Sequence, residues 1–411
     1  MEPTGLSSKM TRPTSLRTMP IWPLAATLAV QTLATASLLS IPAIAPAIAH
    51  NLNVPGELVG VFVSLVYTVG IVSALASPGF IHRYGATRVT QVIMVSVLGL
   101  LVIGAGGTLV GLAAGAVVLG LAYGACAPAS THLLVPHTPR ASFNMVMSLR
   151  QIGVPLGGVM GAVMLPPITL AFGWRWALLV QIPPVIALAL LMELPRRRWD
   201  ADRDPTHHLF GTTLLLPFLL LRDAAIRHLS IASFLYSGIQ LCFIAFMTVN
   251  LTSTMRFTLV EAGAMLAVYQ LAAAVSRPFW GWIADKFLTP ANTLALHGVG
   301  MALCCVAASR FAPGWPHWAI LLVVVGAGCT AGGYTGVAYA DYAALGGSRR
   351  TEATGLGTAM MFVGITLMPP AFGAVVTGAG GYKAAYLMLA ALGLVGAIML
   401  CLPRGPSKHT S

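Results

Sequence analysis

The sequence predicts an all-α membrane protein in which twelve transmembrane helices form two pseudo-symmetric six-helix bundles. Its 411 residues are 57% hydrophobic and only 8% charged, whereas about 25% of the residues in an ordinary soluble domain are charged. The mean hydropathy of +0.83 leaves too little polar surface to cover a compact body in water. Soluble fold classes are therefore excluded, and the chain is expected to lie in a lipid bilayer.

The first half contains six apolar runs long enough to cross a bilayer, for which about 20 residues are needed. They are 21–49, 58–81, 89–108, 109–134, 145–171 and 174–194. Only a glycine-rich hinge at 104–111 separates the third run from the fourth. The first run follows basic residues and ends in small ones, as a secretory signal does, but it is too long for one and more spans follow it. We therefore expect a retained first helix.

The second half repeats this pattern with six more runs. They are 229–251, 259–284, 291–311, 315–342, 353–377 and 384–402. The apolar segment 209–221 contains Pro217 and is too short to cross, so we expect it to lie along the inner membrane interface.

The most polar interval, 195–208, separates six spans from six and predicts the domain organisation. We expect an N-terminal tail at 1–20, bundles at 21–194 and 229–402, a central loop at 195–228 and a C-terminal tail at 403–411. A weak internal repeat supports the division, because 82–85 resembles 285–288 and 173–177 resembles 381–385. Repeats related by an axis along the membrane normal are typical of alternating-access carriers, whose site lies near the bilayer midplane.

The distribution of basic residues predicts the topology. If both termini are cytoplasmic, seventeen Lys and Arg residues lie inside and four (Arg175, Arg256, Arg310 and Lys383) lie outside, as the positive-inside rule requires. We therefore expect a multi-pass protein of the cytoplasmic membrane and no nucleic-acid binding, despite the net charge of +12. The six cysteines show no metal-ligand spacing and are interpreted as core residues.

The loop after the second span carries a family resemblance. His82, Arg83, Gly85 and Arg88, together with the second copy at Gly281, Asp285 and Lys286, resemble the loop signature of the major facilitator superfamily. The resemblance covers essentially the whole chain and implies that these loops connect the two bundles at the inner gate. The family has Asp where His82 stands, so the first copy lacks its carboxylate.

The fifth span resembles, more loosely, a glycine-proline motif of antiporter-type members of the superfamily. Gly153, Pro155 and Gly157 carry the resemblance, which implies a role in conformational change. Close helix packing at the glycines and a local bend at the proline explain the same residues equally well.

Arg150 and Arg277 are the basic residues that lie well inside spans, where an ionised arginine costs about 2.5 to 3.5 kcal/mol. At 1.5 Å per residue, both lie about 12 to 14 Å from the inner ends of their helices. The family fold implies that their helices are neighbours across the bundle interface. Two like charges in low dielectric repel each other unless an anion lies between them.

The sequence around Arg277, Arg-Pro-Phe-Trp-Gly, is similar to the Arg-Pro element of monocarboxylate transporters, which implies carboxylate recognition. That group has an Asp where Ala273 stands, so its proton-coupling pair is not carried over. An arginine fork suits bidentate capture of a carboxylate, and we expect a small organic anion as substrate. Further polar candidates for the binding site are Gln270, Tyr269, Gln31, Tyr236, Gln240 and Tyr334.

Several alternatives remain open at this stage. The two arginines could form salt bridges with Asp285, Asp341 or Glu193 and hold the inner gate shut. The protein could be a proton-coupled drug exporter, although two buried arginines would repel lipophilic cations, or a membrane sensor that does not transport. No carboxylate lies at mid-span, so the sequence gives no indication of proton coupling. It contains no phosphate-binding glycine loop, so we do not expect ATP to drive transport. We expect a monomer. We expect it to have no enzymatic activity and to bind no cofactor or metal.

Overall fold

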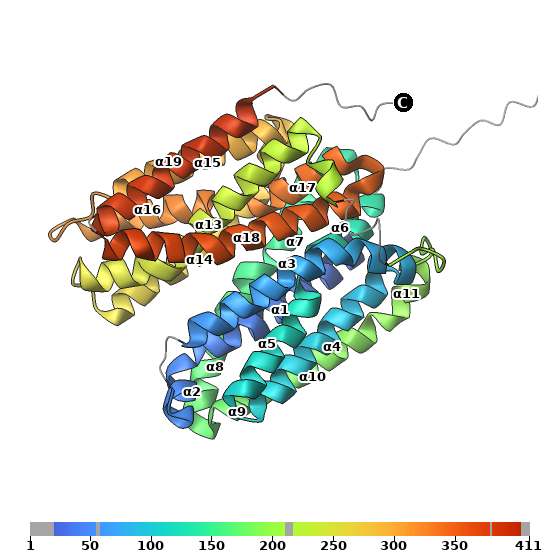
Figure 1. The fold of residues 1–411 in the computed structure, drawn as a ribbon, viewed down its shortest axis with the longest axis horizontal. Helices are drawn as coiled ribbons and strands as arrows, with labels where there is room; N and C mark the ends of the chain where they lie inside the picture. Colours follow the sequence, from blue (N-terminus) through green and yellow to red (C-terminus); the bar gives the residue numbers. More distant parts are fainter. Residues whose placement is uncertain (1–19, 55–57, 210–216, 379, 404–411) are drawn as a thin grey trace, which may run out of the picture.

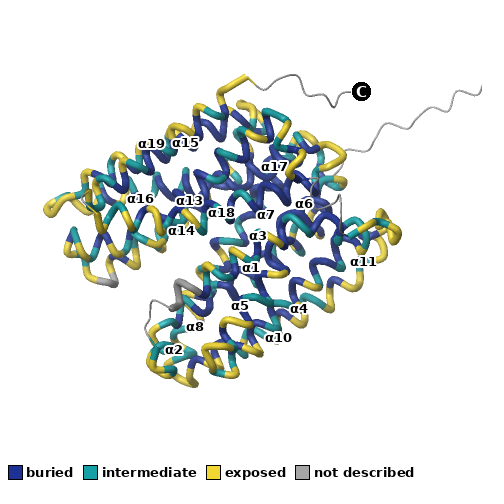
Figure 2. Tube along the Cα trace, in the orientation of Figure 1, coloured by how far each residue is buried: buried dark blue, intermediate teal, exposed yellow. Residues whose placement is uncertain are grey.

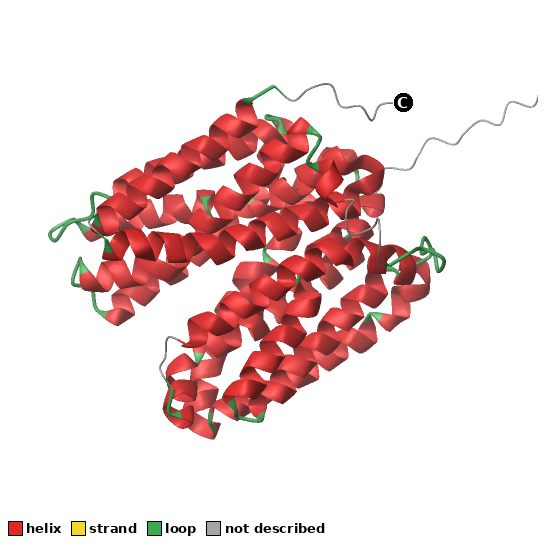
Figure 3. Cartoon of the chain, viewed as in Figure 1, coloured by secondary structure: helices red, strands yellow, loops and turns green. Residues whose placement is uncertain are grey.

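The computed structural model describes residues 20–54, 58–209, 217–378 and 380–403, and these fold into helices joined by short turns, with no strand among them (Figure 3). Nearly all of the two predicted tails, and the central part of the predicted interfacial segment 209–221, lie outside the described residues. The ribbon separates into two groups of helices that follow one another in the chain (Figure 1).

The N-terminal group contains eleven α-helices that make six passes. They are α1 (Ile21–Ala43), α2 (Ala45–Leu52), α3 (Leu58–Tyr84), α4 (Ala86–Ala105), α5 (Leu109–Tyr123), α6 (Cys126–Leu134), α7 (Phe143–Gln151), α8 (Gly153–Phe172), α9 (Trp174–Leu179), α10 (Ile182–Leu191) and α11 (Glu193–Trp199). Two 3₁₀ turns, η1 (Val135–His137) and η2 (Arg140–Ser142), connect α6 to α7. The predicted hinge at 104–111 is confirmed, because α4 ends at Ala105 and α5 begins at Leu109.

The C-terminal group makes the other six passes among the described residues. Its helices are α13 (Ala224–Ser253), α14 (Leu259–Lys286), α15 (Pro290–Ala308), α16 (His317–Thr330), α17 (Thr335–Gly346), α18 (Arg350–Thr377) and α19 (Gly381–Cys401), with η3 (Gly347–Arg349) between α17 and α18. Ten helical stretches of the described chain are long and apolar enough to cross a membrane. One of them, 317–377, doubles back where α17 packs on α18, and α14 completes the set of twelve.

Five predicted spans are broken where the prediction had one continuous helix. The breaks fall at Ile44, Gly124–Ala125, Ile152, Val180–Gln181 with Met192 in the same span, and Ala331–Tyr334. Some of them lie close to a proline, which cannot donate a backbone hydrogen bond: Pro42 lies in the last turn of α1, and Pro155 in the first turn of α8. At Gly124 a Cβ would lie 2.1 Å from the carbonyl oxygen of Gly70, so the chain bends against α3 where only glycine fits.

The central loop is shorter than the predicted 195–228. Helix α11 continues to Trp199, and α13 begins at Ala224 because the Asp223 carboxylate accepts hydrogen bonds from the N–H groups of Ala225 and Ile226. Charged residues can extend a helix beyond the membrane, where Arg196 pairs with Glu193 one turn away. Hydropathy marks the apolar part of a helix and therefore misses such polar ends.

Each group has its own hydrophobic core, one including Val97, Leu100 and Leu119 and the other Met301, Cys305 and Leu389. Buried positions are also dense where the two groups meet, around α6, α7 and α17 (Figure 2). Large apolar side chains such as Val92 and Leu303 are exposed on the outer surface, as expected for helices that face lipid.

The two groups meet near one end of the molecule, which we call the terminal face: it carries the start of α1, the end of α19 and the turns η2 and η3. There α7 packs against α14 and α17, while α18 packs against α3 and α6. Toward the end that carries α2 and α9, the ribbons of the two groups diverge (Figure 1).

Candidate functional site

A central cavity of ≈ 90 Å³ lies between the two groups of helices. Both groups supply polar side chains to its wall, chiefly Gln31, Gln151, Gln240, Arg277, Tyr334 and Tyr339. Several of these residues lie at or beside helix breaks, since Gln151 ends α7 and Tyr334 immediately precedes α17. Backbone N–H and carbonyl groups at such breaks lack their usual partners within the helix. Polar side chains and free backbone groups therefore lie together around the cavity.

Arg277 joins the two groups of helices at the cavity wall. Its side chain is 1% exposed. Nε donates a hydrogen bond to the carbonyl oxygen of Gly332, at the break between α16 and α17, over 2.9 Å. Nη1 donates to the carbonyl oxygen of Gln151, at the break between α7 and α8 of the opposite group. One guanidinium therefore bridges two helix breaks.

Arg150 lies at the same level, next to Gln151 in sequence, and is 0% exposed. Its Nη2 donates to Oε1 of Gln31 over 2.6 Å and to the carbonyl oxygen of Cys126 over 3.3 Å. Its Nε and Nη1 are buried and have no hydrogen-bond partner in the described part of the chain. A buried donor without a partner is costly, more so on a charged group, so this cation is incompletely satisfied.

Among ion pairs between described residues, none includes Arg150 or Arg277. Asp285 is occupied by donors at the start of α7, and Glu193 pairs with Arg88 and Arg196. Two of the carboxylates considered as partners in a salt bridge thus have other contacts. The positive charge beside the cavity is held by carbonyl and amide oxygens.

The other sequence-predicted binding residues fall into two sets. Gln31, Gln240 and Tyr334 line the cavity with Arg277. Gln31 also donates from Nε2 to the hydroxyl groups of Thr35 and Tyr123, so it links Arg150 to α1 and α5.

The second set lies away from the cavity wall. Tyr236 is buried against Gly298 and Gly396, and Tyr269 is buried near Gly328 of α16. Gln270 lies beside Gly158 of the opposite group. In the described residues none of the three lines the cavity, so each is better placed to support the packing of α13 or α14.

Sequence reasoning missed several cavity residues, notably Gln151, Tyr339 and Thr358. The guanidinium carbon of Arg150 lies 5.9 Å from the centre of the Tyr339 ring, a cation–π distance. Gln151 could have been found as the polar neighbour of a buried arginine. Tyr339 and Thr358 had no signal in the sequence, because tyrosine and threonine are common in packed spans.

At the terminal face, Asp285 connects the end of α14 to the start of α7. Its carboxylate accepts hydrogen bonds from the backbone N–H groups of Asn144 and Met145, both over 3.0 Å, and from the Asn144 amide over 2.8 Å. Gly281 makes this approach possible, since a Cβ there would lie 2.7 Å from Cα of Met145. Lys286 is exposed beside it. We call this the Asp285 contact.

The first copy of the loop motif also contacts the opposite bundle, but here the carboxylate comes from the facing helix and the loop supplies a histidine. His82 Nε2 lies 3.2 Å from Oε1 of Glu352, in the first turn of α18. The family's carboxylate is missing from this loop, and the facing helix supplies one instead. We call this the His82 contact.

The neighbours of His82 form a titratable cluster. His132 Nδ1 lies 2.8 Å from Oγ1 of Thr351, and its Nε2 lies 2.9 Å from Oδ2 of Asp202. The rings of His132 and His207 lie 5.4 and 5.1 Å from that of His82. The hydrogen bond with His132 lowers the pKa of the Asp202 carboxyl below its ordinary value.

Arg83 and Gly85 stabilise the loop itself. Arg83 Nη1 donates to the carbonyl oxygen of His207 over 3.4 Å. Gly85 has φ +93°, and a Cβ there would lie 2.2 Å from Asp200. The Asp200 carboxylate accepts hydrogen bonds from the N–H groups of Thr87 and Arg88 at the start of α4 and so caps that helix.

The glycines of the fifth span pack against α1. A Cβ at Gly153 would lie 2.8 Å from the carbonyl oxygen of Leu28, and one at Gly157 would lie 2.5 Å from that of Thr32. Pro155 is buried between them. Close approach of α8 to α1 therefore accounts for the positions of these glycines.

No group of three or more His, Cys, Asp and Glu side chains that could hold a metal ion occurs in the described residues.

Comparison with known proteins agrees with this architecture. The family model of the Major Facilitator Superfamily matches residues 26–287 and 229–411. No curated protein is similar enough in sequence to count as a match.

Three solved structures illustrate the likeness of fold. The human organic anion transporter MFSD10 (TETRAN) has a TM-score of 0.76 at 12% identity, over 93% of this chain and 100% of that one. The E. coli fucose:proton symporter FucP has a TM-score of 0.71 at 15% identity, over 93% and 98%. The proton:xylose symporter XylE has 0.70 at 12% identity, over 93% and 95%.

Proposed function

The chain belongs to the major facilitator superfamily, and from that premise we propose that it carries a small organic anion, such as a carboxylate, across the cytoplasmic membrane by alternating access. The similar solved structures share 12–15% identity with it, which is a likeness of fold. The argument for an anion therefore rests on the cavity of this chain.

The observation that carries the proposal is a buried positive charge at the cavity that takes part in none of the ion pairs found between described residues. Arg277 lines the cavity. Arg150 is not among the lining residues, but it adjoins Gln151, which is, and two of its buried nitrogens have no hydrogen-bond partner in the described chain. Two guanidinium groups at one level repel each other in a low dielectric. An anion between them would relieve that repulsion and could accept the free donors.

The contacts of Arg277 suggest how binding could be coupled to transport. While Arg277 donates to the Gln151 carbonyl, it ties α14 to the break between α7 and α8. A bound carboxylate is a stronger acceptor than a backbone carbonyl and would compete for the same donor. The substrate would thereby weaken one link between the two bundles as it binds.

The size of the cavity favours a small solute over the drug-exporter alternative. Pockets for drug-sized ligands measure about 300–1,000 Å³, whereas this cavity has ≈ 90 Å³. Lipophilic cations would also meet the like charge of Arg277. The same polar lining would suit a neutral sugar, so the test must separate the two classes.

The charge distribution also supports an orientation. With seventeen basic residues assigned to the inner side and four to the outer, the terminal face would be cytoplasmic. Under this proposal the conformation described here has its cytoplasmic side closed and its outer side open.

The test is a thermal-shift screen of the purified protein against monocarboxylates, dicarboxylates, inorganic anions and neutral sugars, followed by tracer flux in proteoliposomes. We expect at least one carboxylate to raise the unfolding temperature and to be transported. Arg277→Ala should abolish both effects, and Arg277→Lys should retain part of the binding, because lysine keeps the charge and loses the fork.

The control is Arg310→Gln, which removes an exposed arginine from a loop on the opposite face. It should leave the shift and the flux unchanged. Stabilisation by a carboxylate that persists in Arg277→Ala would exclude this residue from the site. Stabilisation by neutral sugars alone would replace the anion proposal with a sugar carrier.

A further inference from the structure

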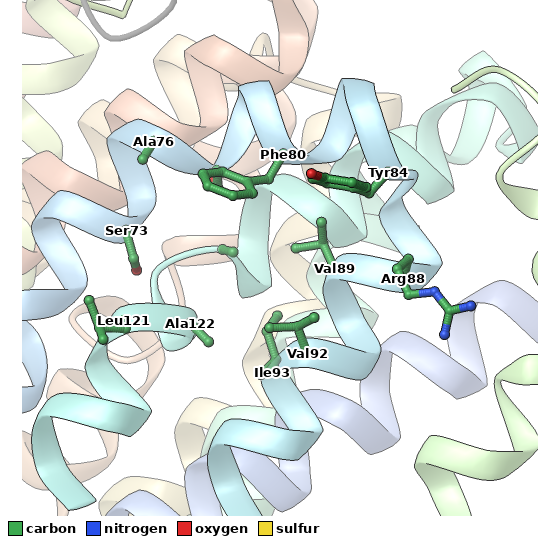
Figure 4. Close-up of a pocket in the computed structure, with 12 residues that line it drawn as sticks. Ser73, Ala76, Phe80, Tyr84, Arg88, Val89, Val92, Ile93, Leu121 and Ala122 are labelled. Carbon is green, nitrogen blue, oxygen red and sulfur yellow. The ribbon is translucent and has the colours of Figure 1, made fainter. Parts of the chain in front are cut away.

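A second and larger hollow lies on the outer surface of the N-terminal bundle, between α3, α4 and α5. Its volume is ≈ 380 Å³. Phe80 and Tyr84 of α3 form one wall, Val92 and Ile93 of α4 the other, and Leu121 of α5 the far end (Figure 4). All three helices belong to stretches able to cross a membrane, so this hollow, which we call the α3–α5 groove, opens toward lipid.

The groove exists because small residues stand where larger ones would fill it. Ala76, Ser77 and Ala122 lie along it, and α5 is broken nearby, where the N–H of Gly124 donates to Oγ of Ser73 over 3.0 Å. The exposed apolar side chains Val92 and Leu121 form its rim.

The interior presents almost no free hydrogen-bonding capacity. The hydroxyl of Ser73 donates to the carbonyl oxygen of Gly70, and that of Ser77 donates to the carbonyl oxygen of Ala74. A water molecule needs two to four polar partners to be held in a cavity, and here the two serines are already occupied. The groove therefore favours a hydrocarbon occupant.

The end of the groove nearest the terminal face is polar and positively charged. Tyr84 stacks on Phe80, and the Arg83 guanidinium lies 5.7 Å from the Tyr84 ring. Arg88 stands at the margin, with its guanidinium extending beyond the apolar side chains (Figure 4). Its Nη1 contacts Glu193 at 3.4 Å and Gln91 at 2.9 Å.

More basic residues follow beside Arg88. A surface hollow of ≈ 540 Å³ is lined by Arg196, Arg197 and Arg203 against a single carboxylate, Asp200. Asp200 accepts hydrogen bonds from the N–H groups of Thr87 and Arg88, so this hollow adjoins the mouth of the groove. Positive charge thus exceeds negative charge where an apolar channel meets the membrane surface.

We propose that the α3–α5 groove binds an anionic glycerophospholipid, with one acyl chain in the groove and the phosphate at Arg88. Hydrocarbon matches the dry interior, and basic residues at the inner end of transmembrane helices attract anionic headgroups. A lipid in the bilayer can contact the apolar interior of the groove and the basic residues at its margin at the same time. This inference depends on membrane insertion and is independent of the transported substrate.

The experiment measures lipid binding to the delipidated full-length protein by native mass spectrometry. The probes are phosphatidylglycerol, phosphatidylcholine with the same acyl chains, and glycerol 3-phosphate as the headgroup alone. We expect preferential retention of one phosphatidylglycerol, and Arg88→Gln should reduce that preference about fivefold, as expected for one basic side chain at the surface. Arg88→Lys should restore it.

A second variant tests the groove itself. Ala76→Phe should fill the channel and reduce the retention of both lipids, whereas Leu303→Phe, on the exposed surface of α15, should not. Unfolding temperatures of the two Phe variants show whether a loss of binding reflects a loss of fold.

Four results would overturn the proposal. These are equal retention of the two lipids by the unsubstituted protein, retention that Ala76→Phe does not change, competition by glycerol 3-phosphate as effective as that by phosphatidylglycerol, and a lipid-independent dimer that Ala76→Phe dissociates. The last result would assign the groove to a second copy of the chain.

Discussion

The Asp285 contact and the His82 contact occupy equivalent places in the two halves of the sequence but use opposite chemistry. Asp285 reaches from the end of α14 to backbone N–H groups at the start of α7. His82 reaches from the end of α3 to a carboxylate in the first turn of α18. The carboxylate comes from the loop motif in one half and from the facing helix in the other.

The two sides of the interface therefore depend on different interactions. A carboxylate that accepts hydrogen bonds from N–H groups at a helix start interacts favourably with the helix dipole. A histidine and a carboxylate share a hydrogen bond, and they also attract each other as ions when the histidine is protonated. Variants on each side can separate the contributions of the two contacts to closure.

The largest effect is expected from Gly281→Ile. Its Cβ would overlap the backbone at Met145, so the terminal face should open at a cost of about 1–3 kcal/mol, typical of overpacking. The measurement is the distance between spin labels at the exposed positions Arg140 and Ser348, one in each bundle. The control is Gly263→Ile on the same helix, where a Cβ would meet nothing within 4 Å. Equal behaviour of the two variants would contradict the close approach.

Asp285→Asn should have the next largest effect. The amide keeps one acceptor but loses the charge that faces the start of α7, which is worth about 1–2 kcal/mol in partly buried geometry. The same pair of labels should report a larger open population than in the unsubstituted protein. An unchanged distance distribution would contradict a role of this charge in closure.

His82→Gln should weaken closure by about 1 kcal/mol, the net contribution of a typical hydrogen bond. His82 Nε2 contacts the buried Glu352 across the two bundles, whereas the contact of His132 with Asp202 lies within the N-terminal group. The same pair of labels should report a larger open population in His82→Gln. An unchanged distance distribution would contradict a contribution of this contact to closure.

The Asp202 carboxylate makes a separate contribution that depends on pH. The hydrogen bond with His132 lowers its pKa below the ordinary value of 3.8, so the stability it contributes is present above that value and is lost as the pH falls through the lowered pKa.

Arg83→Gln should have the smallest effect. Its guanidinium donates one long hydrogen bond, 3.4 Å, to the His207 carbonyl, and the change in closure should stay within about 0.5 kcal/mol. A larger change would indicate that Arg83 positions His207 against His82.

The sequence predicts the fold well because lipid imposes one rule on every span. Apolar length sets each crossing, so the hinge at 104–111 and the depth of Arg150 and Arg277 follow from hydropathy and counting. The helix breaks do not follow, because glycine and proline are tolerated in membrane helices. At Gly124 only the approach of α3 explains the bend.

The site is predicted only in part for the same reason. Arg277 and Gln31 stand out because buried polar groups are rare in spans, and both line the cavity. Their partners do not stand out. The Gln151 carbonyl belongs to the backbone, and Glu352 lies 270 residues from His82. Such pairs depend on how the two bundles dock, which local sequence does not encode.

The helix breaks beside the cavity, between α5 and α6 and between α16 and α17, give each half of the protein a hinge. α6 has 9 residues and α17 has 12, and each is separated from its longer outer partner, α5 or α16, at the depth of Arg277. The short helices α6 and α17 can tilt while α5 and α16 stay in place. One end of the path between the bundles can therefore close by local bending as well as by rotation of whole bundles. Amide hydrogen exchange faster in α6 and α17 than in α5 and α16 would reveal such hinges in motion.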